Sequence, residues 1–189
     1  ITAGPTHEPI DAVRFIGNRS SGRMGISLAQ AAVELGWEVV LLLGPVPNGP
    51  PECEGLTVHR FRTCSDLERL LRQHVDSVDV LIMAAAVADY RPAIGAHHAS
   101  GKLRRTEGPL SLHLESTPDL LASVAARRRC DQTIVGFALE PREGLVESAM
   151  AKLRRKRVDM VVANPLETMD ADTIEAVVVS ADGGAQDAP

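Results

Sequence analysis

A segment rich in glycine and serine near the start of the chain has the composition of an anion-binding loop. Residues 17–25 read Gly-Asn-Arg-Ser-Ser-Gly-Arg-Met-Gly and lead into an amphipathic stretch. Free backbone N–H groups and the positive end of a helix attract phosphate in such segments. Arg23 and Met24 stand where a Walker A loop has Lys and Ser/Thr, and the glycine spacing is not G-x-G-x-x-G. An anion site and an ordinary Ser-capped helix start therefore both remain open.

A second candidate follows a buried apolar run. Residues 84–90 read Ala-Ala-Ala-Val-Ala-Asp-Tyr, directly after an expected strand. Open α/β sheets bind ligands at the carboxyl ends of their strands, and small side chains there let a flat ligand approach the backbone. Asp89 offers a carboxylate to a metal ion, although a turn or helix cap is the more common role of such a residue.

Lysine is rare in this chain, which has seventeen Arg and three Lys. Lys152 and Lys156 are four residues apart on an expected helix and could address a triphosphate together. A solvated helical face explains the same spacing. Lys102 lies in an irregular stretch, where a lone lysine is usually only solvated.

Composition excludes several classes of function. The net charge is −5, and no basic stretch carries interleaved aromatic residues, so a nucleic-acid groove is not expected. The longest apolar runs are shorter than the ~18–20 residues that cross a bilayer, so no membrane span is expected. Cys53, Cys64 and Cys130 have no metal-ligand or disulfide spacing, which favours a reducing cytoplasm. No motif for covalent catalysis is present, and the neighbouring His97 and His98 are not expected to form a site.

The elements that must position these residues follow an alternation of short apolar runs with longer amphipathic stretches. This pattern predicts one α/β domain with a mainly parallel sheet flanked by helices. A long irregular stretch, 89–108, has the length of a lid or binding loop, and the tail from about residue 181 is expected to be frayed. The strands are expected at 1–4, 37–43, 58–61, 78–84, 110–114, 133–138, 158–163 and 176–179. The helices are expected at 20–35, from Ser65 to about 75 with Glu68 in a capping box, from Thr117 with Pro118 in the first turn, and at 143–157.

Three segments together, residues 1–11, 13–25 and 84–92, resemble phosphopantothenate-cysteine ligase, an enzyme of coenzyme A biosynthesis. The stretches 135–140 and 161–164 have counterparts in that family, so the resemblance spans about residues 1–179. It implies a Rossmann-like three-layer fold and a homodimer. In many bacteria the domain follows a flavin-dependent decarboxylase domain, which would suit a chain that starts inside a strand.

The resemblance also implies a two-step reaction. The carboxylate of 4'-phosphopantothenate attacks the α-phosphate of a nucleotide, usually CTP, with Mg²⁺, and pyrophosphate leaves. The amine of cysteine then captures the acyl nucleotide. No protein nucleophile is needed, because such transfers depend on positioning and on cations.

The family's functional residues carry over position by position. Asn18 and Arg14 match residues at the acyl nucleotide, Lys102 matches a lysine of a basic flap, and Asp89 matches an aspartate at the nucleotide and its metal. Thr117 and Pro165 depart from the family, which has Asn and Asp at these positions. The implied nucleotide-binding set is Gly4, Ser20, Ser21, Gly22, Met83, Ala84, Ala85, Asp89, Lys102, Ser116, Thr117, Pro118, Asp119, Phe137, Lys152 and Lys156.

Two other functions compete with this one. A non-catalytic nucleotide-binding partner of a decarboxylase would not need Asn18 or Lys102. A nicotinamide-dependent oxidoreductase is weakened by the missing G-x-G-x-x-G spacing.

Overall fold

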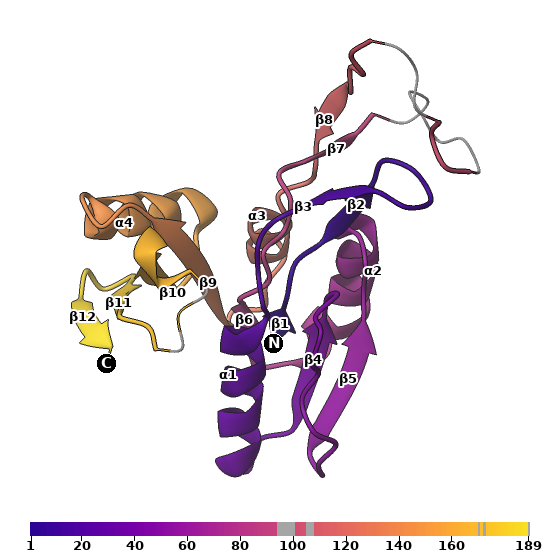
Figure 1. Cartoon of the computed structure of the whole chain (residues 1–189). Helices are drawn as coiled ribbons and strands as arrows, with labels where there is room; N and C mark the ends of the chain where they lie inside the picture. Colours follow the sequence, from indigo (N-terminus) through magenta and orange to yellow (C-terminus); the bar gives the residue numbers. More distant parts are fainter. Residues whose placement is uncertain (94–100, 105–107, 170, 172, 189) are drawn as a thin grey trace.

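A computed structural model gives the structure of the protein and describes residues 1–93, 101–104, 108–169, 171 and 173–188. Its core is an eight-stranded sheet in the order β12-β11-β10-β9-β6-β1-β4-β5 (Figure 1). The sheet strands are β1 (Thr2–Ala3), β4 (Val39–Leu43), β5 (Leu56–Arg60), β6 (Val80–Met83), β9 (Thr133–Glu140), β10 (Met160–Pro165), β11 (Ala176–Ser180) and β12 (Ala185–Ala188). The helices are α1 (Arg23–Glu34), α2 (Cys64–His74), α3 (Leu120–Ala125) and α4 (Leu145–Lys156), with short 3-10 turns at Val75–Ser77 and Leu166–Thr168.

The sheet is mainly parallel, as predicted. All neighbours from β5 to β10 run parallel, whereas β11 and β12 are antiparallel. The chain starts at the centre in β1, builds outward through β4 and β5, and returns to β6 on the other side of β1. The order of the strands therefore reverses between β1 and β6. Sheets of this kind bind ligands at the carboxyl ends of the strands beside such a switch point.

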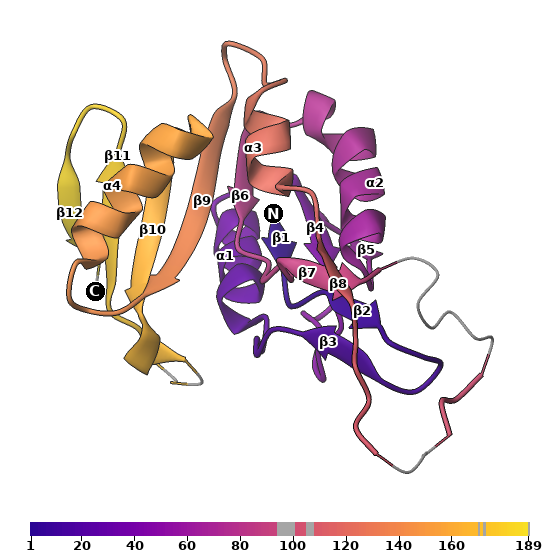
Figure 2. The ribbon, with the colours of Figure 1, turned by 90° about the horizontal axis from the view of Figure 1, so that it is seen from above.

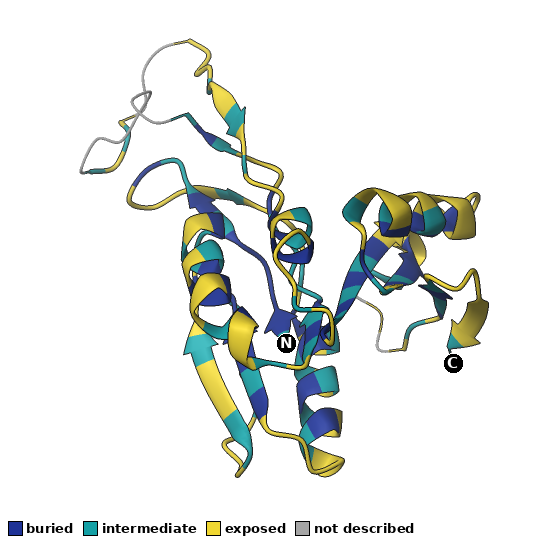
Figure 3. Ribbon diagram, turned by 180° about the vertical axis from the view of Figure 1, so that it is seen from behind, coloured by how far each residue is buried: buried dark blue, intermediate teal, exposed yellow. Residues whose placement is uncertain are grey.

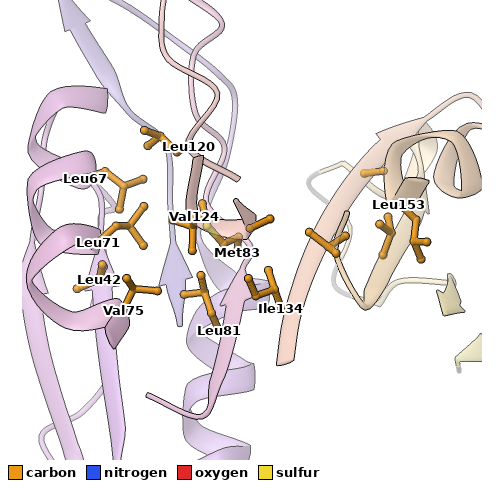
Figure 4. Packing of buried hydrophobic residues seen from close by; sticks show 14 of the residues in the cluster. Leu42, Leu67, Leu71, Val75, Leu81, Met83, Leu120, Val124, Ile134 and Leu153 are labelled. Carbon is orange, nitrogen blue, oxygen red and sulfur yellow. The ribbon is translucent and has the colours of Figure 1, made fainter. Parts of the chain in front are cut away.

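Helices cover both faces, which gives the three expected layers (Figures 2 and 3). Leu41 and Leu43 of β4 belong to one buried cluster with Ala29 of α1. Leu42 points to the opposite face, because side chains alternate along a strand, and joins a larger cluster with α2, α3 and α4. Figure 4 shows this larger cluster, in which Leu71 of α2 points toward Val124 of α3, and Leu81 of β6 lies between Val75 and Ile134. No helix in the described part of the chain is long and apolar enough to cross a membrane.

Two short ribbons form an arm beyond the carboxyl ends of the strands (Figure 1). One ribbon pairs β2 (His7–Pro9) with β3 (Phe15–Gly17), and the other pairs β7 (Tyr90–Pro92) with β8 (Leu114–Ser116). β2 lies beside β7, so the ribbons form one unit. The loop between β2 and β3 contacts the described residues of the segment between β7 and β8, through Arg14 and Leu103.

Helix starts differ from the sequence predictions by two or three residues. α1 begins at Arg23 and not at Ser20, because Gly22 adopts a left-handed conformation with φ of 73°. The capping box of α2 is formed by Thr63 and Asp66, not by Ser65 and Glu68. The side chain of Asp119 caps α3, so Pro118 precedes the helix and does not lie in its first turn.

Two predictions for strands were wrong, and one ribbon was missed. The strand expected at 110–114 is found at Leu114–Ser116, paired with β7. The tail was expected to be frayed, but Ala185–Ala188 pairs with β11 as the edge strand β12. The ribbon of β2 and β3 was not predicted, because three-residue strands carry too little alternation to be recognised.

Candidate nucleotide-binding site

A cavity of about 560 Å³ lies at the carboxyl ends of β6 and β9, between α3 and α4. This is the edge of the sheet where the sequence placed a ligand. Ten of the sixteen residues expected to bind nucleotide line it: Met83, Ala85, Asp89, Ser116, Thr117, Pro118, Asp119, Phe137, Lys152 and Lys156. Residues from four separate segments of the chain therefore meet in one cavity.

Cationic side chains of α4 form one wall of the cavity. The ammonium group of Lys152 donates to the carbonyl oxygen of Phe137 at 2.5 Å. Burial lowers the pKa of Lys152, and the nearby carboxylate of Glu140 opposes that shift. Lys156 forms an ion pair with Asp119. Both lysines lie on the cavity side of α4, as their spacing of four residues predicts.

Sequence reasoning missed two polar residues that line the cavity, Tyr90 and Arg155. Arg155 lies three residues after Lys152 on α4, so helical spacing alone could have identified it. Tyr90 directly follows Asp89, and its side chain has no spacing that distinguishes it from an ordinary exposed residue.

The loop of residues 84–89 separates the cavity from the amino-terminal segment. Ala84 and Ala86 donate their N–H groups to the carbonyl oxygens of Thr2 and Gly4, at 3.2 and 3.0 Å. Ala85, Val87 and Asp89 line the cavity. Ala84, an expected nucleotide contact, therefore pairs with β1 and does not line the cavity.

Two threonine hydroxyls hold the Ala88 backbone. Ala88 N–H donates to Thr6 Oγ1 at 2.9 Å, and the Thr117 hydroxyl donates to the Ala88 carbonyl oxygen at 2.6 Å. Thr6 is fully buried. These bonds fix the residue before Asp89, so they also fix where the Asp89 carboxylate is presented.

Asn18 lies on the opposite side of the same loop. Its side-chain amide donates to the carbonyl oxygen of Val87 at 3.0 Å, and the residue is exposed. Asn18 does not line the cavity, but it contacts a residue that does.

The expected contacts Gly4, Ser20, Ser21 and Gly22 also lie outside the cavity. Gly4 and Gly22 pack against Val46, and a Cβ on Gly22 would come within 2.7 Å of the Val46 side chain. The Ser20 and Ser21 hydroxyls lie 3.4 Å from the N–H groups of Gly22 and Arg23, which is long for a hydrogen bond. Tight packing of the chain thus explains the two glycines without a ligand.

Arg14 and Lys102 lie on the arm and not at the cavity. Arg14 forms an ion pair with Asp11 and donates to the carbonyl oxygen of Leu103 at 2.9 Å. Lys102 is exposed and directly precedes Leu103. The neighbouring residues His97, His98 and Arg105 lie outside the described part of the chain.

The donor set suits a magnesium ion that is shared with phosphate. Among the described residues, no three His, Cys, Asp or Glu side chains lie close enough together to hold a metal. Asp89 is exposed at the cavity wall. Mg²⁺ commonly uses one or two carboxylates together with substrate phosphates, so Asp89 fits this role without a further carboxylate.

The parallel sheet, its switch point and a cavity with cations at the strand ends define a doubly wound α/β domain suited to an anionic ligand. Within this class the family is clear. The whole chain, residues 1–189, matches the family described as the DNA/pantothenate metabolism flavoprotein C-terminal domain, and the chain belongs to that family.

Known relatives support this assignment. The chain is 36% identical, over its full length, to the coenzyme A biosynthesis bifunctional protein CoaBC of Bacillus subtilis, and covers 46% of that protein. It is 41% identical, over 88% of its length, to a cysteine/cysteine sulfinic acid decarboxylase from an unidentified prokaryote, and covers 45% of that protein. The chain thus spans about half the length of these relatives.

Solved structures agree with the fold. The crystal structure of a CoaBC C-terminal domain is 38% identical, with a TM-score of 0.81 over all of this chain and 83% of that one. A Cab2 mutant in complex with phosphopantothenate-cysteine has a TM-score of 0.83, over all of this chain and 79% of that one. It is 21% identical, so this likeness concerns the fold alone.

Proposed function

We propose that this chain joins 4'-phosphopantothenate to cysteine in coenzyme A biosynthesis, with a nucleoside triphosphate, preferably CTP, as the energy source. The observation that carries the proposal is the cavity, where Asp89, Lys152 and Lys156 meet beside the loop of residues 84–89. Family membership supports it, as does the 36% identity to the coenzyme A biosynthesis bifunctional protein CoaBC of Bacillus subtilis.

The proposed reaction needs no nucleophilic side chain from the protein. A carboxylate oxygen of 4'-phosphopantothenate bonds to the α-phosphorus, and the bond to pyrophosphate breaks. The amine of cysteine then attacks the acyl carbon, loses a proton, and displaces the nucleoside monophosphate. Mg²⁺ at Asp89 would neutralise phosphate charge while it is bound.

The cations of α4 suit the triphosphate. Lys152 and Arg155 lie on the same wall as Lys156, and their positive charge favours an anionic ligand there. Burial of Lys152 strengthens its interaction with a phosphate, because the surroundings screen charge less than water does.

Asn18, Arg14 and Lys102 are proposed to act on the acyl nucleotide. Asn18 contacts the loop of residues 84–89, whereas Arg14 and Lys102 lie on the arm. We therefore propose a homodimer in which the arm of one subunit covers the cavity of the other. In this arrangement, Arg14 and Lys102 of one subunit would reach the cavity of the other subunit and complete its site.

The cellular setting is also part of the proposal. We expect the chain to act in the cytoplasm, together with a flavin-dependent decarboxylase domain. The full-length match to 46% of a bifunctional CoaBC supports the second expectation.

The test is product formation with each nucleoside triphosphate in turn. Protein, Mg²⁺, 4'-phosphopantothenate and cysteine are incubated with CTP, ATP, GTP or UTP, and the product is identified by mass spectrometry. We expect phosphopantothenoylcysteine, formed fastest with CTP and lost when Mg²⁺ is chelated. Nucleotide binding without product would favour the non-catalytic partner module instead.

A further inference from the structure

Asp11 occupies the turn between β2 and β3 and is almost fully buried, with 7% of its surface exposed. Its oxygen Oδ1 accepts the N–H groups of Val13 at 2.8 Å and Arg14 at 2.7 Å, which closes the turn. Both hydrogen bonds from backbone N–H groups of the turn to the Asp11 side chain therefore go to this one oxygen.

The second oxygen, Oδ2, binds a distant part of the chain. It accepts the N–H of Leu103, 92 residues away, at 3.0 Å. It also accepts Nε of Arg14 at 3.0 Å and pairs with the end of the same guanidinium group. These bonds hold the pKa of the Asp11 carboxyl well below its usual range, chiefly through Arg14.

Leu103 is held at both of its backbone groups. Its N–H donates to Asp11, and its carbonyl oxygen accepts from Arg14 at 2.9 Å. Hydrogen bonds with a charged partner are stronger than neutral ones, so this pair of bonds fixes the peptide well. Lys102 directly precedes Leu103 and has an exposed side chain.

We propose that Asp11 is a positioning residue for Lys102: together with Arg14 it clamps the Leu103 backbone and so sets where the Lys102 ammonium group is presented. The inference rests on the proposed function, because it assigns Lys102 to the ligase reaction. Arg14 then has a second role besides the one proposed at the acyl nucleotide, because its guanidinium group donates both to Asp11 and to the Leu103 carbonyl oxygen.

The sharpest variant is Asp11→Asn. The amide oxygen can still accept the two N–H groups of the turn, but the NH₂ group then faces the donors of Leu103 and Arg14. We expect the Leu103 amide to exchange with solvent deuterium about tenfold faster or more, because its acceptor is lost. The Ile10 N–H group donates to the Arg14 carbonyl oxygen within the turn at 2.8 Å, and its exchange is the internal reference. The Ile10 amide should keep its wild-type exchange rate.

Glu115→Gln is the matched control. Glu115 pairs with Arg91 across β7 and β8 at 2.8 Å, so this variant removes another carboxylate from the same arm. It should leave the exchange of Leu103 unchanged.

A double-mutant cycle separates positioning from a general structural role. Asp11→Asn should slow single-turnover pyrophosphate release by roughly 10- to 100-fold in the wild-type background. In the Lys102→Ala background it should slow release less than about threefold, because the group it positions is already absent.

Two results would overturn the proposal in an active enzyme: unchanged Leu103 exchange in Asp11→Asn, or an equal rate loss in both backgrounds. If wild-type protein released no pyrophosphate with any nucleotide, the ligase function would fail, and a role for Asp11 in that reaction would fail with it. Leu103 exchange would still report separately whether the clamp exists.

Discussion

Asn18 holds the cavity loop through one hydrogen bond, from its side-chain amide to the Val87 carbonyl oxygen. Asn18→Asp replaces this donor with a negative charge beside a carbonyl oxygen and beside the proposed acyl nucleotide. We expect the variant to consume CTP and 4'-phosphopantothenate but to stall at the acyl nucleotide or release it. Mass spectrometry of quenched reactions measures this, and normal turnover would remove Asn18 from the site.

Lys102 is the residue at which a catalytic role and a merely solvated side chain predict the most different effects of substitution. Negative charge grows on the α-phosphate during attack, and a positioned ammonium group stabilises it. Lys102→Ala should therefore slow acyl-nucleotide formation by roughly 10²- to 10³-fold. Lys102→Arg should restore only part of the rate, because a planar guanidinium group differs from a compact ammonium group.

Both Lys102 variants should keep the wild-type melting temperature, since the side chain is exposed. Single-turnover pyrophosphate release measures the rates. A Lys102→Ala rate within about threefold of wild type would mean that Lys102 is merely solvated.

The cavity residues were predictable from the sequence to different degrees. Helical spacing places Lys152 and Lys156 on one face of a helix, and Asp89 follows a buried strand, but only the family resemblance assigned all three to a nucleotide site. The sequence could not predict that Lys156 pairs with Asp119 or that Thr117 binds the Ala88 backbone. These contacts join segments that are distant in the chain, so no local pattern encodes them.

At the scale of elements, α1 packs unusually close to β1 at Gly25. A Cβ at this position would come within 2.5 Å of the Ala3 Cβ and 2.9 Å of the Thr2 carbonyl oxygen. Gly25→Ala gains about 1 kcal/mol of helix propensity, but the clash with the strand forces the helix to shift. We expect a net destabilisation of about 1–3 kcal/mol.

Urea unfolding measures this change. Ser27→Ala, at an exposed position of the same helix, is the control and should change the free energy of unfolding by less than about 0.5 kcal/mol. Equal stability of the Gly25→Ala variant and wild type would contradict the close packing of α1 on β1.

The elements that were predicted well are the long and strongly periodic ones. β4 is an unbroken apolar run because both of its faces are covered, and α4 shows clear helical spacing. The start of α2 was misplaced because Thr63 and Ser65 are equally suitable caps by residue type. Only the reciprocal bonds between Thr63 and Asp66 decide between them.

In the whole molecule, the cavity adjoins the base of the arm, where Tyr90 of β7 and Ser116 of β8 line it, but it does not reach the loops of the arm that carry Arg14 and Lys102. The cavity is between α3 and α4. Arg14 lies in the loop between β2 and β3, and Lys102 lies between β7 and β8; Figure 2 shows these two ribbons side by side. We therefore expect a second subunit to complete a site that uses both groups.

We expect a homodimer at micromolar concentration, measured by sedimentation. Mixing an arm variant, Lys102→Ala, with a cavity variant, Lys152→Ala, should restore part of the activity, because mixed dimers then contain one intact composite site. A fully active monomer would contradict this arrangement, and so would mixed dimers without any recovery.

We propose that the protein activates the carboxylate of 4'-phosphopantothenate before cysteine reacts. Single-turnover pyrophosphate release from CTP and 4'-phosphopantothenate, with cysteine left out, tests this most directly. We expect about one pyrophosphate per active site. We also expect an acyl nucleotide, which later addition of cysteine converts to phosphopantothenoylcysteine. Absence of pyrophosphate under these conditions with every nucleoside triphosphate, from folded dimeric protein, would contradict it.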